Sequence, residues 1–137
     1  MPTLTLQLNH QPSAERAAEI ARRLTALTAT LLGKRPEVTA VVIQAMPREH
    51  WFIGGEAAAL PAARLGIRIS SGTHTDGEKA AFIAQAWRAL AQWHAPLGEL
   101  APASYVEISE RPLEDWGYAG RTQAARRCAH GEAATPA

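Results

Sequence analysis

The sequence predicts an α+β fold in which two β-α-β repeats form a four-stranded sheet with two helices on one face. Three observations support this. Alternating apolar and polar residues indicate strands, two long segments carry an apolar stripe at helical spacing, and the order of these elements repeats once. With 137 residues, of which 47% are hydrophobic and 20% charged, the chain suits one compact domain.

The first repeat begins with a strand over residues 3–8, where leucines alternate with polar side chains. Ser13 is the expected N-cap of a helix over 14–32, and Gly33 is expected to end it. An apolar run over 40–46 predicts the second strand, and consecutive glycines after it indicate a hairpin. The apolar stripe of the helix is expected to consist of Ala17, Ile20, Ala21, Leu24, Leu27 and Leu31.

The second repeat begins with an alternating strand over residues 66–70. Thr75 and Glu78 have the spacing of a capping box, which predicts the start of a second helix. A last strand is expected over 104–110, after a loop that contains Gly98. The stripe of the second helix is expected to consist of Ala80, Ile83, Ala86, Trp87, Leu90 and Trp93.

A Pro-x-Glu-x-Trp pattern supports duplication, because it occurs at Pro47 and again 65 residues later at Pro112. We therefore expect one domain over 1–120, with the first repeat at about 2–55 and the second at about 65–120. The tail, 121–137, is rich in alanine and arginine and has no buried pattern. It is expected to be flexible or to form one short helix.

Composition excludes several classes of partner. The net charge of +1 gives no general field for nucleic acid or an anionic membrane, and no apolar run approaches the roughly 20 residues of a membrane span. The single cysteine, Cys128, excludes an internal disulfide and fits a reducing compartment, so we expect a cytoplasmic protein. The histidines are scattered, and neither metal-ligand spacing nor a phosphate-binding loop is evident.

The second face of the predicted sheet is too polar for a core. The side chains expected on it are Thr3, Thr5, Gln7, Arg68 and Ser70. We expect this face to pack against other subunits, and a ring or barrel of sheets is the simplest closed arrangement.

Pro2 has a possible chemical role because of its position. Removal of Met1 would leave a free secondary amine at the start of a buried strand, and such an amine is a usable base. From position alone, a rigid strand entrance is the better explanation of the proline, and the chemical role depends on further features.

The run His50-Trp51-Phe52-Ile53-Gly54-Gly55, together with Pro2 at the first strand, resembles the tautomerase superfamily, and 4-oxalocrotonate tautomerase in particular. Over its whole length the chain resembles the duplicated members, such as 5-carboxymethyl-2-hydroxymuconate isomerase, cis-3-chloroacrylic acid dehalogenase and macrophage migration inhibitory factor. The resemblance implies a homotrimer with one reactive proline per chain. The second-half position equivalent to Pro2 lies near Leu65, which is internal and has no free amine.

The resemblance also implies a reaction without metal or cofactor. Pro2 would act as general base and acid, moving a proton α to a carbonyl in a small 2-keto or unsaturated carboxylic acid. Burial and nearby cations would lower the pKa of its amine towards neutrality. The alternatives are an isomerase of the 5-carboxymethyl-2-hydroxymuconate type, a dehalogenase or decarboxylase relative, and a catalytically silent trimeric binding protein.

The arginines that bind substrate in 4-oxalocrotonate tautomerase have no counterpart here. Their absence is the reason for the alternative of a catalytically silent binding protein. The corresponding positions hold Pro12, Ala40, Thr75 and Tyr105. Gly33-Lys34 and Tyr105 instead match the migration-factor pattern. Lys34 would then hold a substrate carboxylate, and Tyr105 would donate a hydrogen bond as a catalytic residue. A cation at a helix C-terminus and a packed strand tyrosine are the structural alternatives.

Three further residues are candidates for substrate binding. Trp51 matches the aromatic residue that walls the proline pocket in relatives, although simple burial explains it too. Arg68 could hold an anion or form an intersubunit ion pair. His74 replaces an arginine of relatives and could bind an anion when protonated, or be merely solvated. Trp116, Tyr118 and the basic tail could cap the pocket or cover a neighbouring subunit.

Overall fold

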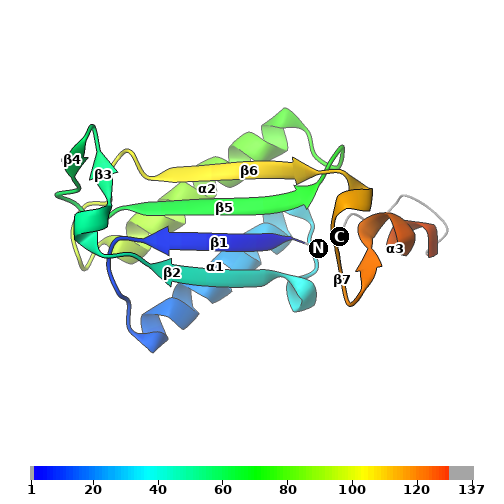
Figure 1. Cartoon of the computed structure of the whole chain (residues 1–137), viewed down its shortest axis with the longest axis horizontal. Helices are drawn as coiled ribbons and strands as arrows, with labels where there is room; N and C mark the ends of the chain where they lie inside the picture. Colours follow the sequence, from blue (N-terminus) through cyan, green and yellow to red (C-terminus); the bar gives the residue numbers. More distant parts are fainter. Residues whose placement is uncertain (1, 130–137) are drawn as a thin grey trace.

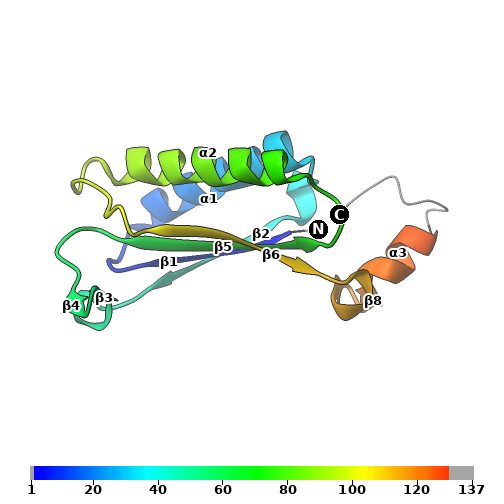
Figure 2. The same ribbon diagram turned by 90° about the horizontal axis from the view of Figure 1, so that it is seen from above.

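A four-stranded mixed sheet with two long helices on one face forms the body of the molecule (Figures 1 and 2). The computed structural model describes residues 2–129. The elements, in which η denotes a 3-10 helix, are β1 (Thr3–Leu8), α1 (Ala14–Leu32), η1 (Pro36–Val38), β2 (Ala40–Ala45), η2 (Arg48–His50), β3 (Phe52–Ile53), β4 (Glu56–Ala57), β5 (Ala63–Ser70), α2 (Asp76–His94), β6 (Tyr105–Arg111), η3 (Leu113–Asp115), β7 (Gly117–Tyr118), β8 (Arg121–Thr122) and α3 (Gln123–Ala129).

The strands lie in the order β2-β1-β5-β6. Each β-α-β unit contributes a parallel pair, β1 with β2 and β5 with β6, and the two units meet through the antiparallel pair β1–β5. Thr3 therefore lies opposite Ala40 on one side and Arg68 on the other. This topology confirms the predicted α+β fold, with the last strand one residue later than expected.

Both long helices begin at the predicted caps. The Ser13 hydroxyl accepts a hydrogen bond from the Arg16 amide, and Thr75 with Glu78 forms a complete capping box. At the other end of α1, Gly33 adopts φ 64°, the left-handed conformation that lets a chain leave a helix sharply.

The core lies between the sheet and the helices, and α2 presents a different stripe from the one predicted. Phe82 is fully buried, whereas Ile83 is 38% exposed and Ala80 is also exposed. The buried residues of α2 are Phe82, Ala86, Ala89, Leu90, Trp93 and His94. Ala86, Leu90 and Trp93 belong to both the predicted and the observed stripe. In the first turns of α2, the ring of Phe82 packs into the core in place of Ala80 and Ile83.

Two histidines close the core where α2 ends. Nε2 of His10 lies 2.8 Å from Nε2 of His94, and Nδ1 of His94 lies 2.7 Å from the Leu90 carbonyl. Since a carbonyl only accepts, His94 carries its proton on Nδ1, and His10 donates to Nε2. Burial, the facing His94 and then two arginine charges lower the pKa of His10 to about 4; burial, with the charge of Arg16, also lowers the pKa of His94.

This pair makes the fold sensitive to acid. A histidine whose pKa is lower in the folded state stabilises the fold above pH 6.5 and loses that contribution as the pH falls towards 4. Because solvent screens the partly exposed His10 ring, we expect a loss of about 2 kcal/mol in the free energy of unfolding, less than the full pKa difference would give. His10→Gln should flatten this dependence in urea titrations between pH 4 and 7, whereas His50→Gln, at an exposed position, should leave it unchanged. If the free energy of unfolding of His10→Gln falls with acid as steeply as that of the unmodified protein, His10 is not the group responsible.

Each β-α-β unit ends in a 3-10 turn and a short hairpin, and the two hairpins lie at opposite ends of the sheet (Figure 1). Pro47 and Pro112 precede the 3-10 turns, and Trp51 and Trp116 follow them, as the repeated pattern predicts. The β7–β8 hairpin and α3 lie beyond the end where β1 begins, on the side of the sheet away from the long helices (Figure 2).

The tail begins with β8, which completes the second hairpin with β7, and then forms the short helix α3, one of the two structures expected for it. The rest of the predicted tail, residues 130–137, lies outside the described residues. No helix of the described part of the chain is long and apolar enough to span a membrane.

Candidate active site

Pro2 lies buried where β1 begins. Its carbonyl accepts a hydrogen bond from the Ala40 amide at 3.3 Å, which ties it to the first residue of β2. On the other side, the pairing of Thr3 with Arg68 brings Pro2 beside the end of β5, near Ile69 and Ser70. The residue is therefore held between the two neighbouring strands.

Lys34 follows the left-handed Gly33 at the end of α1 and is only 2% exposed. Its Nζ is buried and has no hydrogen-bond partner among the described residues. Burial lowers the pKa of Lys34 to about 8, with a further contribution from the charge of Arg127. A cation solvated at the end of a helix would be exposed, so the simple helix-end interpretation does not account for this side chain.

His74 lies in the loop before α2, with a side chain that is 5% exposed. Its Nδ1 is 3.5 Å from Oε1 of Glu78, longer than a charge-assisted hydrogen bond. Burial and the nearby charge of Lys34 lower the pKa of His74, against the opposite effect of Glu78 and Glu110. Lys34 and His74, both predicted as site residues, therefore lie close to one another.

Ser70 departs from the expected polar face of the sheet. It is expected on the face that packs against other subunits, but it is fully buried within its own chain, and its Oγ has no partner among the described residues. Its position at the last residue of β5, where β6 continues towards η3 and the second hairpin, explains why this end of the face is covered.

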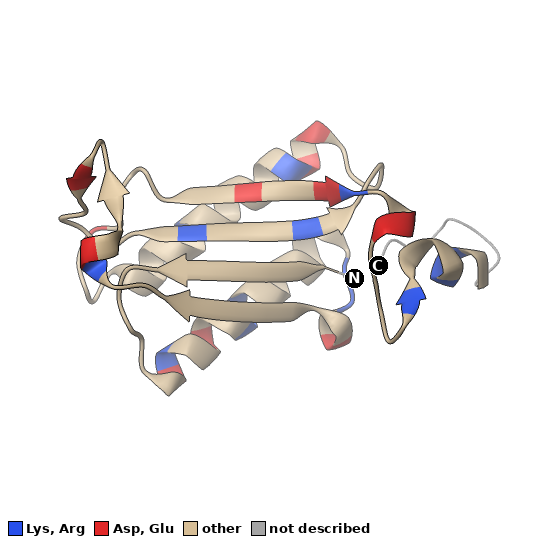
Figure 3. Ribbon diagram, viewed as in Figure 1, with Lys and Arg blue, Asp and Glu red and all other residues tan. Residues whose placement is uncertain are grey.

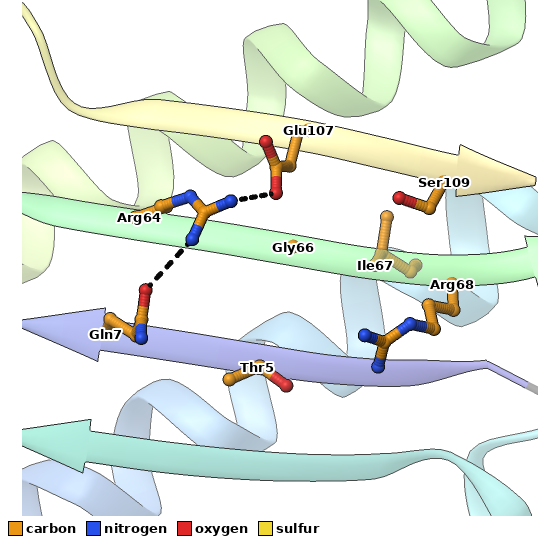
Figure 4. Close-up of a pocket in the computed structure, with 8 residues that line it drawn as sticks. All are labelled: Thr5, Gln7, Arg64, Gly66, Ile67, Arg68, Glu107 and Ser109. Atoms are coloured by element: carbon orange, nitrogen blue, oxygen red, sulfur yellow. Dashed lines mark hydrogen bonds and ion pairs between the residues drawn. The ribbon is translucent and has the colours of Figure 1, made fainter.

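Arg68 lies on the polar face of the sheet, away from the long helices (Figure 4). This face has a hollow of about 230 Å³, and Arg64 crosses it to bind Glu107 at 2.8 Å and Gln7 at 3.3 Å. Arg68 has no ion pair with any described residue. The residues that line the hollow are Thr5, Gln7, Arg64, Gly66, Ile67, Arg68, Glu107 and Ser109.

Tyr105 and Trp51 lie at the opposite end of the molecule from Pro2. Tyr105 pairs with Arg64 at the start of β6 and is 64% exposed. Through Arg64, Tyr105 is level with Gln7 of β1. Gln7 is five residues from Pro2, which is about 16 Å along the strand. Trp51 ends η2 beside the β3–β4 hairpin, at that same far end. Within one chain, neither side chain joins Pro2, Lys34 and His74.

At the Pro2 end of this chain, the tryptophan is instead Trp116, which follows η3. Its Nε1 is buried and has no partner among the described residues. The sequence contains a pattern from which the position of Trp116 near Pro2 could be predicted. The repeated pattern matches Trp51 to Trp116, and an antiparallel pairing of the two units exchanges their ends, which places the second hairpin near Pro2.

Among the described residues, no three His, Cys, Asp or Glu side chains lie close enough together to bind a metal ion. The polar side chains at this end of the sheet that have no hydrogen-bond partner among the described residues include Lys34, Ser70, His74 and Trp116.

Comparisons with known proteins find relatives of the same fold. A family model described as tautomerase enzyme matches residues 2–60. The solved structure of a native fused 4-OT is 30% identical, with a TM-score of 0.75, and covers 90% of this chain and 97% of that chain. A second fused 4-OT, F6, solved as a wild-type asymmetric trimer, is 29% identical, with a TM-score of 0.77 and coverage of 90% and 98%.

Macrophage migration inhibitory factor from Toxoplasma gondii shares the fold at 17% identity, with a TM-score of 0.73 and coverage of 88% of this chain and 98% of that chain. No curated protein matches the sequence. On the family model and on the identity shared with the native fused 4-OT along nearly the whole chain, this protein belongs to the tautomerase superfamily.

Proposed function

We propose that this protein is a cofactor-free tautomerase, in which Pro2 moves a proton α to a carbonyl in a small 2-keto or unsaturated acid. The observation that carries the proposal is the position of Pro2, buried at the start of β1 in a chain of this family. The buried, unpaired Lys34 at the same end of the sheet supports it. A charged group kept out of water without a partner is costly unless a ligand supplies the opposite charge.

The proposed reaction follows from these groups. The neutral amine of Pro2 takes a proton from the carbon next to the carbonyl, and the electrons of the broken C–H bond form the enol or enolate. Protonated Pro2 then returns the proton to a different atom, which moves the double bond. Lys34 binds the substrate carboxylate, and His74, beside it, is a second polar contact for the substrate.

We further propose a homotrimer in which the polar face of the sheet is the interface. The hollow on this face, with the unpaired Arg68, is suited to contact with another chain. Fused 4-OT relatives are trimers. In such an assembly Tyr105 and Trp51 would act on the Pro2 site of a neighbouring copy, since within their own chain they lie at the far end.

The function can be tested directly with the purified protein. Intact mass should show that Met1 is absent, and the ketonisation of the phenylpyruvate enol should be faster than in buffer alone. 3-Bromopyruvate should label the amine of Pro2, and substrate should compete with the label. Retained Met1, or no acceleration with several 2-keto acids, would instead favour a catalytically silent binding protein. That alternative is supported by Pro12 and Ala40, which occupy the positions of substrate-binding arginines in 4-oxalocrotonate tautomerase.

The pH dependence of KM should report on Lys34. Because its pKa is lowered to about 8, the side chain is charged at pH 7 and loses its charge as the pH rises through 8. Carboxylate binding should then weaken, and KM should rise about tenfold between pH 7 and 9. Lys34→Arg, which keeps its charge, should show no such rise. A KM that stays constant in the unmodified protein would exclude Lys34 as the carboxylate ligand.

A further inference from the structure

A cavity of about 200 Å³ lies between the loop before α1 and the end of α2. The residues that line it include His10, Pro12 and Arg16 from the first of these segments and Trp93, Pro96 and Leu97 from the second. Because β1 runs away from Pro2 and His10 follows its last residue, the cavity lies at the opposite end of the chain from Pro2. A cavity of about 150 Å³ can bind benzene, so this one is large enough for a single-ring molecule.

The place of this cavity corresponds to that of Lys34 and His74 in the other repeat. Lys34 follows α1 and His74 lies in the loop before α2, whereas the cavity lies after α2 and beside the loop before α1. The loop after α2, 95–104, holds no buried cation, since Glu99 is its one charged residue and is exposed. The two corresponding places therefore differ in chemistry.

Apolar side chains provide much of the lining. Trp93 is only 5% exposed, and Pro12 and Pro96 add their rings to the wall. Leu97 is 57% exposed although it lines the cavity, so it lies at the rim. A molecule with an apolar body would remove this surface from water and would be stabilised by that burial.

Arg16, the cation of the lining, is already paired. Its Nη1 lies 2.6 Å from Oε1 of Glu19, and its Nη2 donates a hydrogen bond to the Trp93 carbonyl. Its Cζ also lies 4.9 Å from the ring centroid of Trp93. Figure 3 shows acidic and basic residues side by side at the start of α1. Among the described residues that line the cavity, none is therefore a free cation for an anionic ligand.

His10 provides an unpaired acceptor. Its proton is on Nε2, which donates to Nε2 of His94 at 2.8 Å, because Nδ1 of His94 donates to the Leu90 carbonyl. A neutral imidazole carries one proton, so Nδ1 of His10 accepts. This atom is not buried and has no hydrogen-bond partner among the described residues. Burial first, and then nearby charges, lower the pKa of His10 to about 4, so the ring is neutral at pH 7.

We propose that this cavity is a second ligand site, which binds a small neutral molecule with an apolar body and a hydroxyl donor, such as a phenol. The hydroxyl donates to Nδ1 of His10, and the ring displaces water from beside Trp93 and Leu97. The inference goes beyond the proposed function, because the site needs neither the Pro2 amine nor turnover.

Histidine-ring NMR tests the proposal on the unmodified protein. Phenol, titrated at pH 7 into protein labelled with ¹⁵N-histidine, should move the Nδ1 resonance of His10 towards the position of a protonated nitrogen and reach saturation. The resonances of His50, which is exposed on η2, should stay unchanged. Toluene, in which a methyl group replaces the hydroxyl, should not move Nδ1 in that direction, and benzoate should not displace phenol.

Two substitutions locate the bound molecule. Leu97→Arg places a charged side chain at the rim and should weaken phenol binding about tenfold. Leu60→Arg is the matched control, because Leu60 is another exposed leucine and does not line the cavity, and it should leave binding unchanged. His10→Phe keeps a ring but removes the acceptor, and it should lower the affinity for phenol relative to toluene about fivefold, the effect of one hydrogen bond.

These measurements separate the cavity from the Pro2 site and from a neighbouring copy. Phenol binding that Leu97→Arg leaves unchanged, or saturation without movement of the His10 resonance, would place the molecule elsewhere and overturn the proposal. The same movement with toluene would exclude the hydroxyl contact. A His10 resonance that moves with protein concentration before phenol is added would also overturn the proposal, because a second copy would then fill the cavity.

Discussion

Pro2→Ala is expected to reduce kcat/KM for enol ketonisation by about two to four orders of magnitude, the contribution typical of a positioned general base. Alanine keeps a free amine after removal of Met1, but the amine is primary and is no longer held by a ring at the start of β1. The substitution therefore tests the placement and basicity of the amine, while the fold is expected to remain. Stopped-flow measurement of enol decay, with intact mass on each sample, gives the result.

The matched control is Pro102→Ala, at an exposed proline in the loop before β6. It should leave the rate unchanged. A Pro2→Ala variant that has lost Met1 and still ketonises the enol at the original rate would exclude Pro2 as the base. A loss of rate accompanied by a changed oligomeric mass would point instead to a structural role for Pro2.

Phe82→Ala is expected to lower the free energy of unfolding by about 3 to 5 kcal/mol. The ring is fully buried in the core cluster between α2 and the sheet, so its removal costs both transfer free energy and a cavity. Urea denaturation followed by circular dichroism, at one fixed protein concentration, should show a lower midpoint and an unchanged slope.

The neighbouring Ile83→Ala provides the control, because Ile83 is 38% exposed on the same helix. The change should cost less than about 1 kcal/mol, since alanine is the better helix former and little apolar area is lost. If the two substitutions cost the same, the stripe predicted from sequence periodicity would be the correct one.

Local rules predicted most of the secondary structure. Alternation identified β1 because every second residue from Leu4 to Leu8 is buried, and the caps at Ser13 and Thr75 depend only on hydrogen bonds within one helical turn. The face of α2 could not be predicted as well. Phe82 and Ile83 are both apolar and adjacent, and only the shape of the sheet beneath decides which one is buried.

The candidate site was harder to predict because it depends on distant contacts. Lys34 was identified as a candidate, but its burial depends on what packs over the end of α1, which no local pattern shows. The sequence of the tail shows no buried pattern, yet Gln123 is only 3% exposed, because η3 and the β7–β8 hairpin pack against α3. Tyr105 and Trp51 are candidates for the same site as Pro2, but within one chain the register of β5 with β6 places Tyr105 at the far end, and Trp51 lies there beside the β3–β4 hairpin. Only contact between copies, which no local pattern shows, would bring them to a Pro2 site.

The beginning of β1 and the last described helix, α3, lie at the same end of the sheet, and this limits how the protein can be handled (Figure 1). An affinity tag ahead of Pro2 would turn its amine into an amide and abolish any basicity. A tag attached directly after α3 would begin at that same end of the sheet. The exposed β3–β4 turn at Gly54 and Gly55 is remote from that end within one chain, but in the proposed trimer it lies beside the Pro2 site of a neighbouring copy, as Trp51 does, so a bulky label there would disturb a second copy's site.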